Sequence, residues 1–189
     1  MNHQFSGIID QLNNSTNPII RYKTRIHLHG YEPDEPTVRR LREEIRDSSI
    51  AQNLLADMAM NNVGNRDGMA TIYATLKYLA DIDYPPGDDS LNPYRDHVYH
   101  WLHDLEKEYD GPLFIRDKYR VHGSFHGNAL YASTVLGISN QETAQLCDNL
   151  LRYQWPNGGW NCNKKPNTSG PTIVHTAYGM RGLLAYQSI

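Results

Sequence analysis

The sequence predicts an all-α protein built from helical hairpins, and three observations support this fold class. Apolar residues recur at helical spacing along most of the chain, as Val38, Leu41 and Ile45 do. No stretch alternates apolar and polar residues for long enough to indicate a sheet. Helices with a charged face also alternate with helices that carry almost no charge, and a helix without charge needs cover on most of its sides.

Punctuating residues set the expected helix boundaries in the first half of the chain. Asn17 can cap a helix that begins at Pro18, where the missing N–H of proline costs nothing. Ser48 or Ser49 can cap another in the same way. We expect helices over residues 17–30, 34–46, 48–58, 69–80 and 93–109, and a Pro/Gly/Asp-rich loop over 81–92.

The second half is expected to begin with an irregular segment, 111–123, because it mixes proline, aromatic and charged residues. A short apolar helix is expected over 127–137. Ser139 and Glu142 have the spacing of a capping box, which predicts the start of a helix that runs to Gln154. The remaining expected elements are a loop over 155–170 and a last helix over 171–186.

The three helices with little charge, 69–80, 127–137 and 171–186, recur at intervals of about fifty residues. A period in this range indicates stacked helical hairpins, each of which needs its neighbours to bury its apolar face. Inner helices surrounded by amphipathic outer helices form an α/α barrel. We expect this domain to cover residues 17–189, after a polar N-terminal segment over residues 1–16.

Bulk composition excludes several classes of protein. The net charge of −3 gives no basic surface for nucleic acid. No apolar stretch approaches the roughly 20 residues that span a bilayer, and no secretory signal opens the chain. Two cysteines, Cys147 and Cys162, are too few for a disulfide framework. We therefore expect a cytoplasmic protein with no membrane span and no nucleic-acid partner.

One segment resembles a known superfamily. Gln154-Trp-Pro-Asn-Gly-Gly-Trp160 resembles the repeat motif of squalene and hopene cyclases and the Gly-Gly-Trp/Phe loops of protein prenyltransferase β-subunits. In such a motif the glutamine can bond free backbone groups, the glycines let the chain reverse, and Trp160 can stack on the next inner helix. The stretches Gly123–Tyr131 and Asn17–Ile26 also resemble segments of prenyltransferase-like proteins.

This resemblance implies an α/α toroid. About four helical hairpins can be counted along the chain, fewer than a closed toroid of the superfamily contains. The chain is therefore expected to be an incomplete toroid, to close its ring by forming a homo-oligomer, or to be a fragment.

The resemblance also suggests a candidate zinc ligand, because the helix with His175 resembles the one that supplies the zinc-binding histidine of protein prenyltransferases. Those enzymes add an Asp and a Cys at the start of the preceding inner helix. The stretch matched to it here, Phe125–Asn128, has neither residue. Cys162 could replace them only from a loop, in a different geometry. We therefore expect no metal, with Cys162 and His175 as the residues that would take part if zinc were bound.

Other candidate chemistry is incomplete. Gly87–Ser90 lacks the first Asp of the cyclase acid motif, so we interpret it as a turn in which an aspartate caps the next helix. An Asp-Asp-x-x-Asp motif is absent, and Asp81-Ile-Asp83 is too short to replace it. His97, His100 and His103 are interpreted as a surface stripe.

Five residues are the candidates for lining a central cavity: His126, Tyr131, Trp160, His175 and Tyr178. Aromatic rings can shelter a cation in such a cavity, although ordinary core packing explains them as well. We expect a prenyltransferase- or cyclase-like toroid that binds an apolar or isoprenoid-like ligand, and no catalytic residue can be assigned. The alternative is a non-catalytic helical-repeat module that binds a protein partner.

Overall fold

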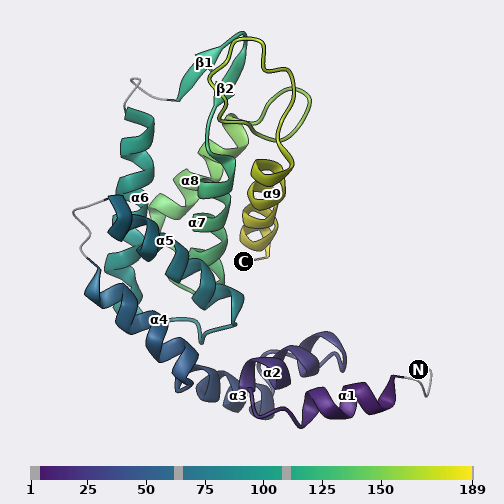
Figure 1. The fold of residues 1–189 in the computed structure, drawn as a ribbon. Helices are drawn as coiled ribbons and strands as arrows, with labels where there is room; N and C mark the ends of the chain where they lie inside the picture. Colours follow the sequence, from purple (N-terminus) through teal and green to yellow (C-terminus); the bar gives the residue numbers. More distant parts are fainter. Residues whose placement is uncertain (1–4, 62–65, 108–111, 189) are drawn as a thin grey trace.

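The computed structural model describes residues 5–61, 66–107 and 112–188 and is mostly helical (Figure 1), which confirms the all-α prediction in outline. Its helices are α1 (Ser6–Asn13), α2 (Pro18–His27), α3 (Pro36–Arg46), α4 (Ser49–Met60), α5 (Arg66–Asp81), η1 (Asp89–Leu91), α6 (Asn92–Lys107), α7 (Gly123–Val135), α8 (Gln141–Arg152) and α9 (Ile173–Gln187).

A small hairpin lies within the segment that was expected to be irregular. Strands β1 (Leu113–Ile115) and β2 (Lys118–Arg120) pair antiparallel, with Phe114 opposite Tyr119. Arg116 and Asp117 between them both have positive φ, as a tight two-residue hairpin turn requires. Strands of three residues are too short to show the alternation that identifies a sheet, so the sequence prediction missed this hairpin.

Local capping explains several boundaries. Asn17 and Ser48 cap α2 and α4 as predicted, and each side chain accepts a backbone N–H of the first turn. The predicted capping box on Ser139 is wrong by one residue. Asn140 and Thr143 form it instead, because the Asn140 side chain accepts from Thr143 N while the Thr143 hydroxyl accepts from Asn140 N.

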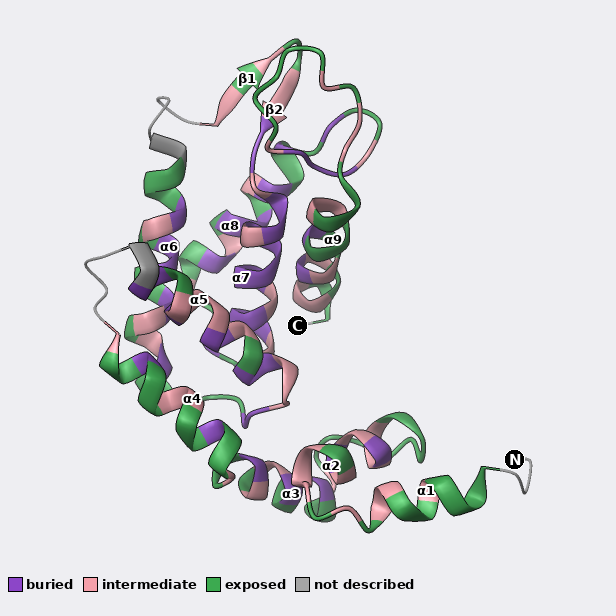
Figure 2. Ribbon diagram, viewed as in Figure 1, coloured by how far each residue is buried: buried purple, intermediate pink, exposed green. Residues whose placement is uncertain are grey.

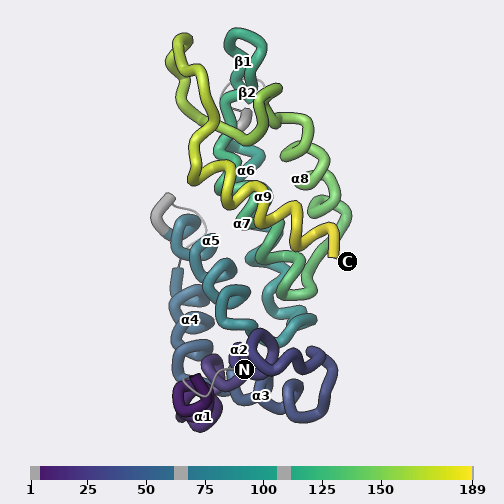
Figure 3. The backbone as a smooth tube through the Cα atoms, turned by 90° about the vertical axis from the view of Figure 1, so that its right-hand side faces the viewer, coloured from purple at the N-terminus to yellow at the C-terminus, as the bar shows by residue number. Residues whose placement is uncertain are grey.

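Two groups of helices make up the molecule. Helices α1–α3 lie together at one end (Figure 1), and α2 and α3 form a small core there from Tyr22, Val38, Leu41 and Ile45. The larger core lies among α4–α9. There α5 and α9 both pack against α7, while α6 and α8 also contact it (Figure 3).

The three helices that carry little charge differ in burial. Helix α7 is buried along almost its whole length, as expected (Figure 2). The expectation that such a helix is covered on most sides is wrong for α9, whose buried positions are Gly179 and Gly182. No described element covers its outer face, which exposes Ile173, Met180 and Leu184.

Candidate metal centre

Three metal-ligand side chains from three different elements meet at one end of α7. His122 immediately precedes this helix, Cys162 lies in the loop after α8, and His175 lies in the first turn of α9. Their ligand atoms all lie within 4.8 Å of one another, and the Cys162 Sγ is 3.1 Å from the His175 Nε2. All three residues are half-buried. Thiolate and imidazole are the ligands that zinc prefers.

Glycines bring α7 and α9 close enough to form this cluster. A Cβ added to Gly127 would lie 2.1 Å from the backbone oxygen of Tyr178, and one added to Gly182 would lie 2.3 Å from the oxygen of Gly127. A Cβ on Gly123, next to His122, would lie 2.6 Å from the Cβ of Trp160. The two backbones therefore approach at a distance that any side chain would prevent.

The segment that resembles the cyclase motif holds the cysteine loop against these helices. Gly158 and Gly159 both have positive φ and reverse the chain. Trp160 then enters the core, fully buried, and its Nε1 donates to the Leu150 oxygen of α8 over 2.8 Å. Its ring also packs where Gly179 leaves room on α9. Cys162 follows two residues later, so its position depends on the burial of Trp160.

Ser124 orients His175. The Ser124 hydroxyl lies 2.9 Å from the His175 Nδ1, and the Ser124 backbone N–H donates to the same nitrogen over 3.3 Å. Tyr73 of α5 donates to the backbone carbonyl oxygen of Ser124 over 3.3 Å and accepts from the Asn128 side chain over 3.0 Å. Burial raises the pKa of Tyr73 to about 12, so its hydroxyl keeps the proton it donates. The start of α7 is thus tied to α5.

Burial controls the protonation of the three ligand residues. It lowers the pKa of His122, together with the charges of neighbouring His175, His126 and Lys164. It lowers the pKa of His175 as well and raises that of the Cys162 thiol. Both imidazoles are therefore neutral at pH 7, so each ring has one unprotonated nitrogen, while the thiol keeps its proton until a metal displaces it.

The spacing of the cluster fits zinc after a small adjustment. Tetrahedral zinc with ordinary bond lengths separates two nitrogens by about 3.3 Å, and sulfur from nitrogen by about 3.6 Å. The Sγ–Nε2 distance of 3.1 Å and the upper limit of 4.8 Å bracket these values. Shifts of roughly 1 Å would complete three bonds, leaving a fourth position to water or a ligand.

An aromatic cluster adjoins the centre. The ring of His122 stacks on Phe125 at 4.9 Å between centroids, with an interplanar angle of 13°. Phe125 in turn lies 5.3 Å from Trp101 and 5.4 Å from Tyr73. All four rings are half-buried, so the centre has an apolar neighbour that is partly accessible to solvent.

A separate recess of about 800 Å³ lies between α6 and α8. Most of the residues that line it are polar, and Leu102 and Leu146 are the two aliphatic ones. The polar lining residues are Asp96, His97, Tyr99, His100, His103, His126, Asn140, Glu142, Gln145 and Asn149.

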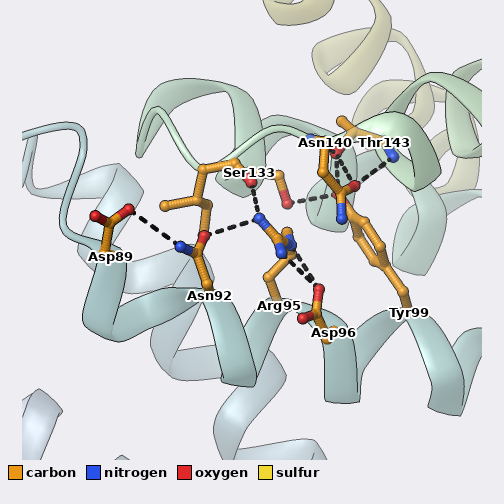
Figure 4. Close-up of polar contacts among 9 residues, drawn as sticks. Asp89, Asn92, Arg95, Asp96, Tyr99, Ser133, Asn140 and Thr143 are labelled. Atoms are coloured by element: carbon orange, nitrogen blue, oxygen red, sulfur yellow. Dashed lines mark hydrogen bonds and ion pairs between the residues drawn. The ribbon is translucent and has the colours of Figure 1, made fainter.

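A hydrogen-bond network fixes the walls of this recess (Figure 4). Buried Arg95 donates to the Ile138 oxygen over 2.5 Å and also bonds Asp96. The Tyr99 hydroxyl joins three helices, because it lies 2.7 Å from the Ser133 Oγ of α7 and 2.9 Å from the Thr143 Oγ1 of α8. These bonds hold Asp96 and Tyr99, two of the residues that line the recess, in place.

The five residues predicted to line a cavity have different surroundings in the described part of the chain. His126 is buried and contributes to the recess between α6 and α8, and its Nδ1 lies 3.1 Å from the His122 oxygen. Trp160 is in the core. Tyr131 lies under the Arg181 guanidinium, 3.5 Å from ring centroid to Cζ. Tyr178 is 36% exposed on α9, and His175 belongs to the metal centre.

Other sequence candidates have structural roles in the described residues. Asp88 caps η1 by accepting from Ser90 N, as the turn interpretation predicts, and also accepts from the Tyr84 hydroxyl. His100 pairs with Asp104 at 3.3 Å. The described residues contain one group of three or more metal-ligand side chains, which is the cluster above, and the histidines of α6 do not belong to it.

His122 is the ligand residue that the sequence prediction passed over. Its neighbours in space, Cys162 and His175, lie 40 and 53 residues further along the chain. Helix α7 starts at Gly123, four residues earlier than predicted, so His122 stands at a helix terminus beside the incoming loop.

Comparison with protein-family models, with curated proteins and with solved structures finds no match. The resemblance to cyclases and prenyltransferases therefore depends on the motif residues alone. Among the described helices, none is long and apolar enough to cross a membrane.

Proposed function

We propose that this protein binds a zinc-type divalent ion through His122, Cys162 and His175 and offers the fourth coordination position to a ligand. One observation carries the proposal: three side chains that zinc prefers come from three separate elements and bring their ligand atoms within 4.8 Å. Surface residues of one helix can cluster by periodicity alone, but this cluster requires the α7–α9 approach and the ordered loop. Two neutral imidazoles and a half-buried thiol support the same proposal.

We further propose that the ligand has an apolar or isoprenoid-like part and that the fold is an incomplete α/α toroid. The motif resemblance supports both, as does the adjacency of α5, α7 and α9. The aromatic cluster of Tyr73, Trp101 and Phe125 would accept the apolar part of such a ligand. Since His122 stacks on Phe125, this part would lie beside the metal centre. A single free thiol as ligand is compatible with a reducing, cytoplasmic location.

A bound zinc ion would supply Lewis acidity and would lower the pKa of a bound water toward about 7. The chain itself would hold the ion in place, keep the ligand imidazoles neutral through burial, and present an apolar surface beside it. This arrangement is typical of a catalytic site with three protein ligands and one exchangeable position.

Metal titration tests the proposal. Chelator-stripped protein is titrated with Zn²⁺ by calorimetry, and Co²⁺ absorption reports the thiolate–metal bond. If the total binding free energy is shared among the ligands, losing one weakens binding by about 100-fold in the variants His122→Ala, Cys162→Ser and His175→Ala. His97→Ala is the matched control, because it removes an exposed histidine outside the cluster. Equal affinity in all four variants would contradict the proposal.

Ligand-observed NMR with farnesol tests the apolar part of the proposal. Binding should weaken in Phe125→Ala and remain unchanged in Phe114→Ala, which alters an exposed ring on the hairpin. Farnesol that binds neither the stripped nor the zinc-loaded protein would remove the isoprenoid-like ligand while leaving the metal centre intact.

The outer face of α9 favours a second candidate, association between copies of this chain. Ile173, Met180 and Leu184 fall on one face of the helix at spacings of seven and four residues and are 88%, 51% and 63% exposed. A contiguous apolar stripe of this kind is typical of a protein–protein contact. Light scattering across a concentration series should show a dimer or larger ring that Leu184→Lys disrupts. A monomer at all concentrations would exclude this candidate.

A further inference from the structure

We propose that the hydroxyl of Ser124 allows His175 to change to the tautomer that can bind the metal, by accepting from the Nδ1–H of that tautomer. The inference rests on the proposed function, since it concerns how one ligand of the centre becomes competent. It is based on one observation: the backbone N–H and the hydroxyl of Ser124 both contact the Nδ1 of His175. The Ser124 backbone N–H donates to the His175 Nδ1 over 3.3 Å, and the Ser124 Oγ lies 2.9 Å from the same atom.

The backbone contact fixes the metal-free tautomer. An amide N–H can only donate, so the Nδ1 that receives it must be the unprotonated nitrogen of a neutral ring. The ring proton is then on Nε2, which lies 3.1 Å from the Cys162 Sγ and donates to it. In this state the nitrogen that faces the cluster has no lone pair for a metal.

Metal binding at Nε2 therefore requires the other tautomer. The proton leaves Nε2 and a proton occupies Nδ1, so the neutral ring keeps one proton throughout, while the Cys162 thiol releases its own to solvent. In that state Nδ1–H needs an acceptor. A hydroxyl can donate in one state and accept in the other, whereas the amide N–H would then face another donor. The Ser124 Oγ is placed to be that acceptor.

The surroundings hold Ser124 in place for this role. Tyr73 donates to the backbone carbonyl oxygen of Ser124 over 3.3 Å, and the side chain of buried Asn128 donates to the Tyr73 hydroxyl over 3.0 Å. Ser124 is itself 7% exposed. Ligating histidines commonly have an outer partner of this kind on the second nitrogen, which fixes their tautomer and direction. Ser124 is thus a positioning residue that acts through His175.

Nitrogen NMR of ¹⁵N-histidine-labelled protein tests the inference directly. In the stripped wild-type protein, His175 should carry its proton on Nε2. On loading with Zn²⁺ or Cd²⁺, the shifts should report a metal-bound Nε2 and a protonated Nδ1. Retention of the Nε2 proton in the loaded protein, or an Nδ1 proton already present in the stripped protein, would overturn the proposal.

Variants provide a second readout. Ser124→Ala keeps the backbone N–H but removes the acceptor, so zinc affinity should fall by about 10- to 100-fold, the usual cost of losing such a partner. Ser124→Thr keeps the hydroxyl and should restore most of the affinity. Ser133→Ala is the control for general destabilisation, because it removes another buried serine hydroxyl of α7 that bonds Tyr99 instead.

The outcomes separate the two proposals. A wild-type protein that binds no zinc contradicts the metal centre and this inference together. Zinc binding that is equal in wild type and Ser124→Ala contradicts the tautomer role alone. If Ser124→Ala does not fold, the wild-type nitrogen shifts and the Ser124→Thr affinity still decide the question.

Discussion

The two sides of α7 make an instructive comparison. His122 and His126 are one helical turn apart and are joined through the His122 oxygen, yet they belong to different sites. His122 meets Cys162 and His175 in a tight cluster, whereas His126 lies in a wide polar recess with three histidines of α6. The recess has more histidines, but the described residues form a metal-ligand group only on the other side.

The difference shows that convergence matters more than the number of ligand residues. Histidines at three-residue steps along one helix diverge around its axis, so His97, His100 and His103 spread over the wall of the recess. The residues of the cluster come from a helix start, a loop and another helix, and each is held by its own contacts. On one side of α7, close packing on glycines brings the three ligand residues together. On the other side, a network of polar side chains holds α6 and α8 around an open recess.

The largest effect should come from breaking the glycine contact. In Gly127→Ala the new Cβ would lie 2.1 Å from the Tyr178 oxygen, so α7 and α9 have to separate. We expect a loss of about 3 kcal/mol in the free energy of unfolding, measured in urea, together with loss of zinc binding. Gly7→Ala, where nothing lies within 4 Å, is the control and should not lose stability. A stable, zinc-binding Gly127→Ala would show that the approach of the helices does not set the site.

The next effect contrasts histidines on the two sides of α7. A triple variant with His97, His100 and His103 all changed to Ala should keep the zinc affinity of the wild type within about twofold. The single variant His122→Ala should lose about 100-fold, close to 2.7 kcal/mol. Calorimetry on both proteins under the same conditions measures this. Weakened binding in the triple variant would assign metal to the recess instead.

Zinc affinity should depend on pH in a direction set by burial. The raised pKa of the Cys162 thiol means that zinc competes with its proton across neutral pH, so affinity should rise about tenfold per pH unit between pH 6.5 and 8. Below 6.5, the ordinary histidine value, the two ligand histidines begin to compete as well, although their lowered pKa delays this. Affinity that does not change with pH would exclude thiolate ligation.

The same histidines affect the stability of the metal-free protein. Their folded-state pKa lies below 6.5, so the unfolded chain binds more protons under acid conditions and stability falls as the pH drops below 6.5. Urea titrations of stripped protein at pH 7.5 and 5.5 measure the loss, which should shrink in His122→Ala.

The smallest effect belongs to the recess. Tyr99→Phe removes the hydroxyl that bonds Ser133 and Thr143 and should cost about 1 kcal/mol of stability without changing zinc affinity. Tyr78→Phe is the control, since Tyr78 is 52% exposed. A change in zinc affinity on Tyr99→Phe would mean that the two sides of α7 are coupled.

The sequence determined the helical class and most helix starts, because capping and periodicity are local properties. Asn17, Ser48 and the aspartate turn before α6 all have their predicted roles. Trp160 was also expected to stack on the helix that follows it, and its ring packs beside Gly179 of α9. The sequence did not predict the hairpin of β1 and β2, because its strands are too short to show an alternation of apolar and polar residues.

Only the tertiary structure decided which side chains meet. Cys162 and His175 are 13 residues apart and His122 is 40 residues before Cys162, so no spacing rule joins them. Their approach depends on three glycines. Gly127 of α7 and Gly182 of α9 lie against each other, and Gly179 of α9 lies against Trp160. A glycine in a sequence signals conformational freedom, but whether that freedom is used for a turn or for close contact depends on the neighbour it meets in space.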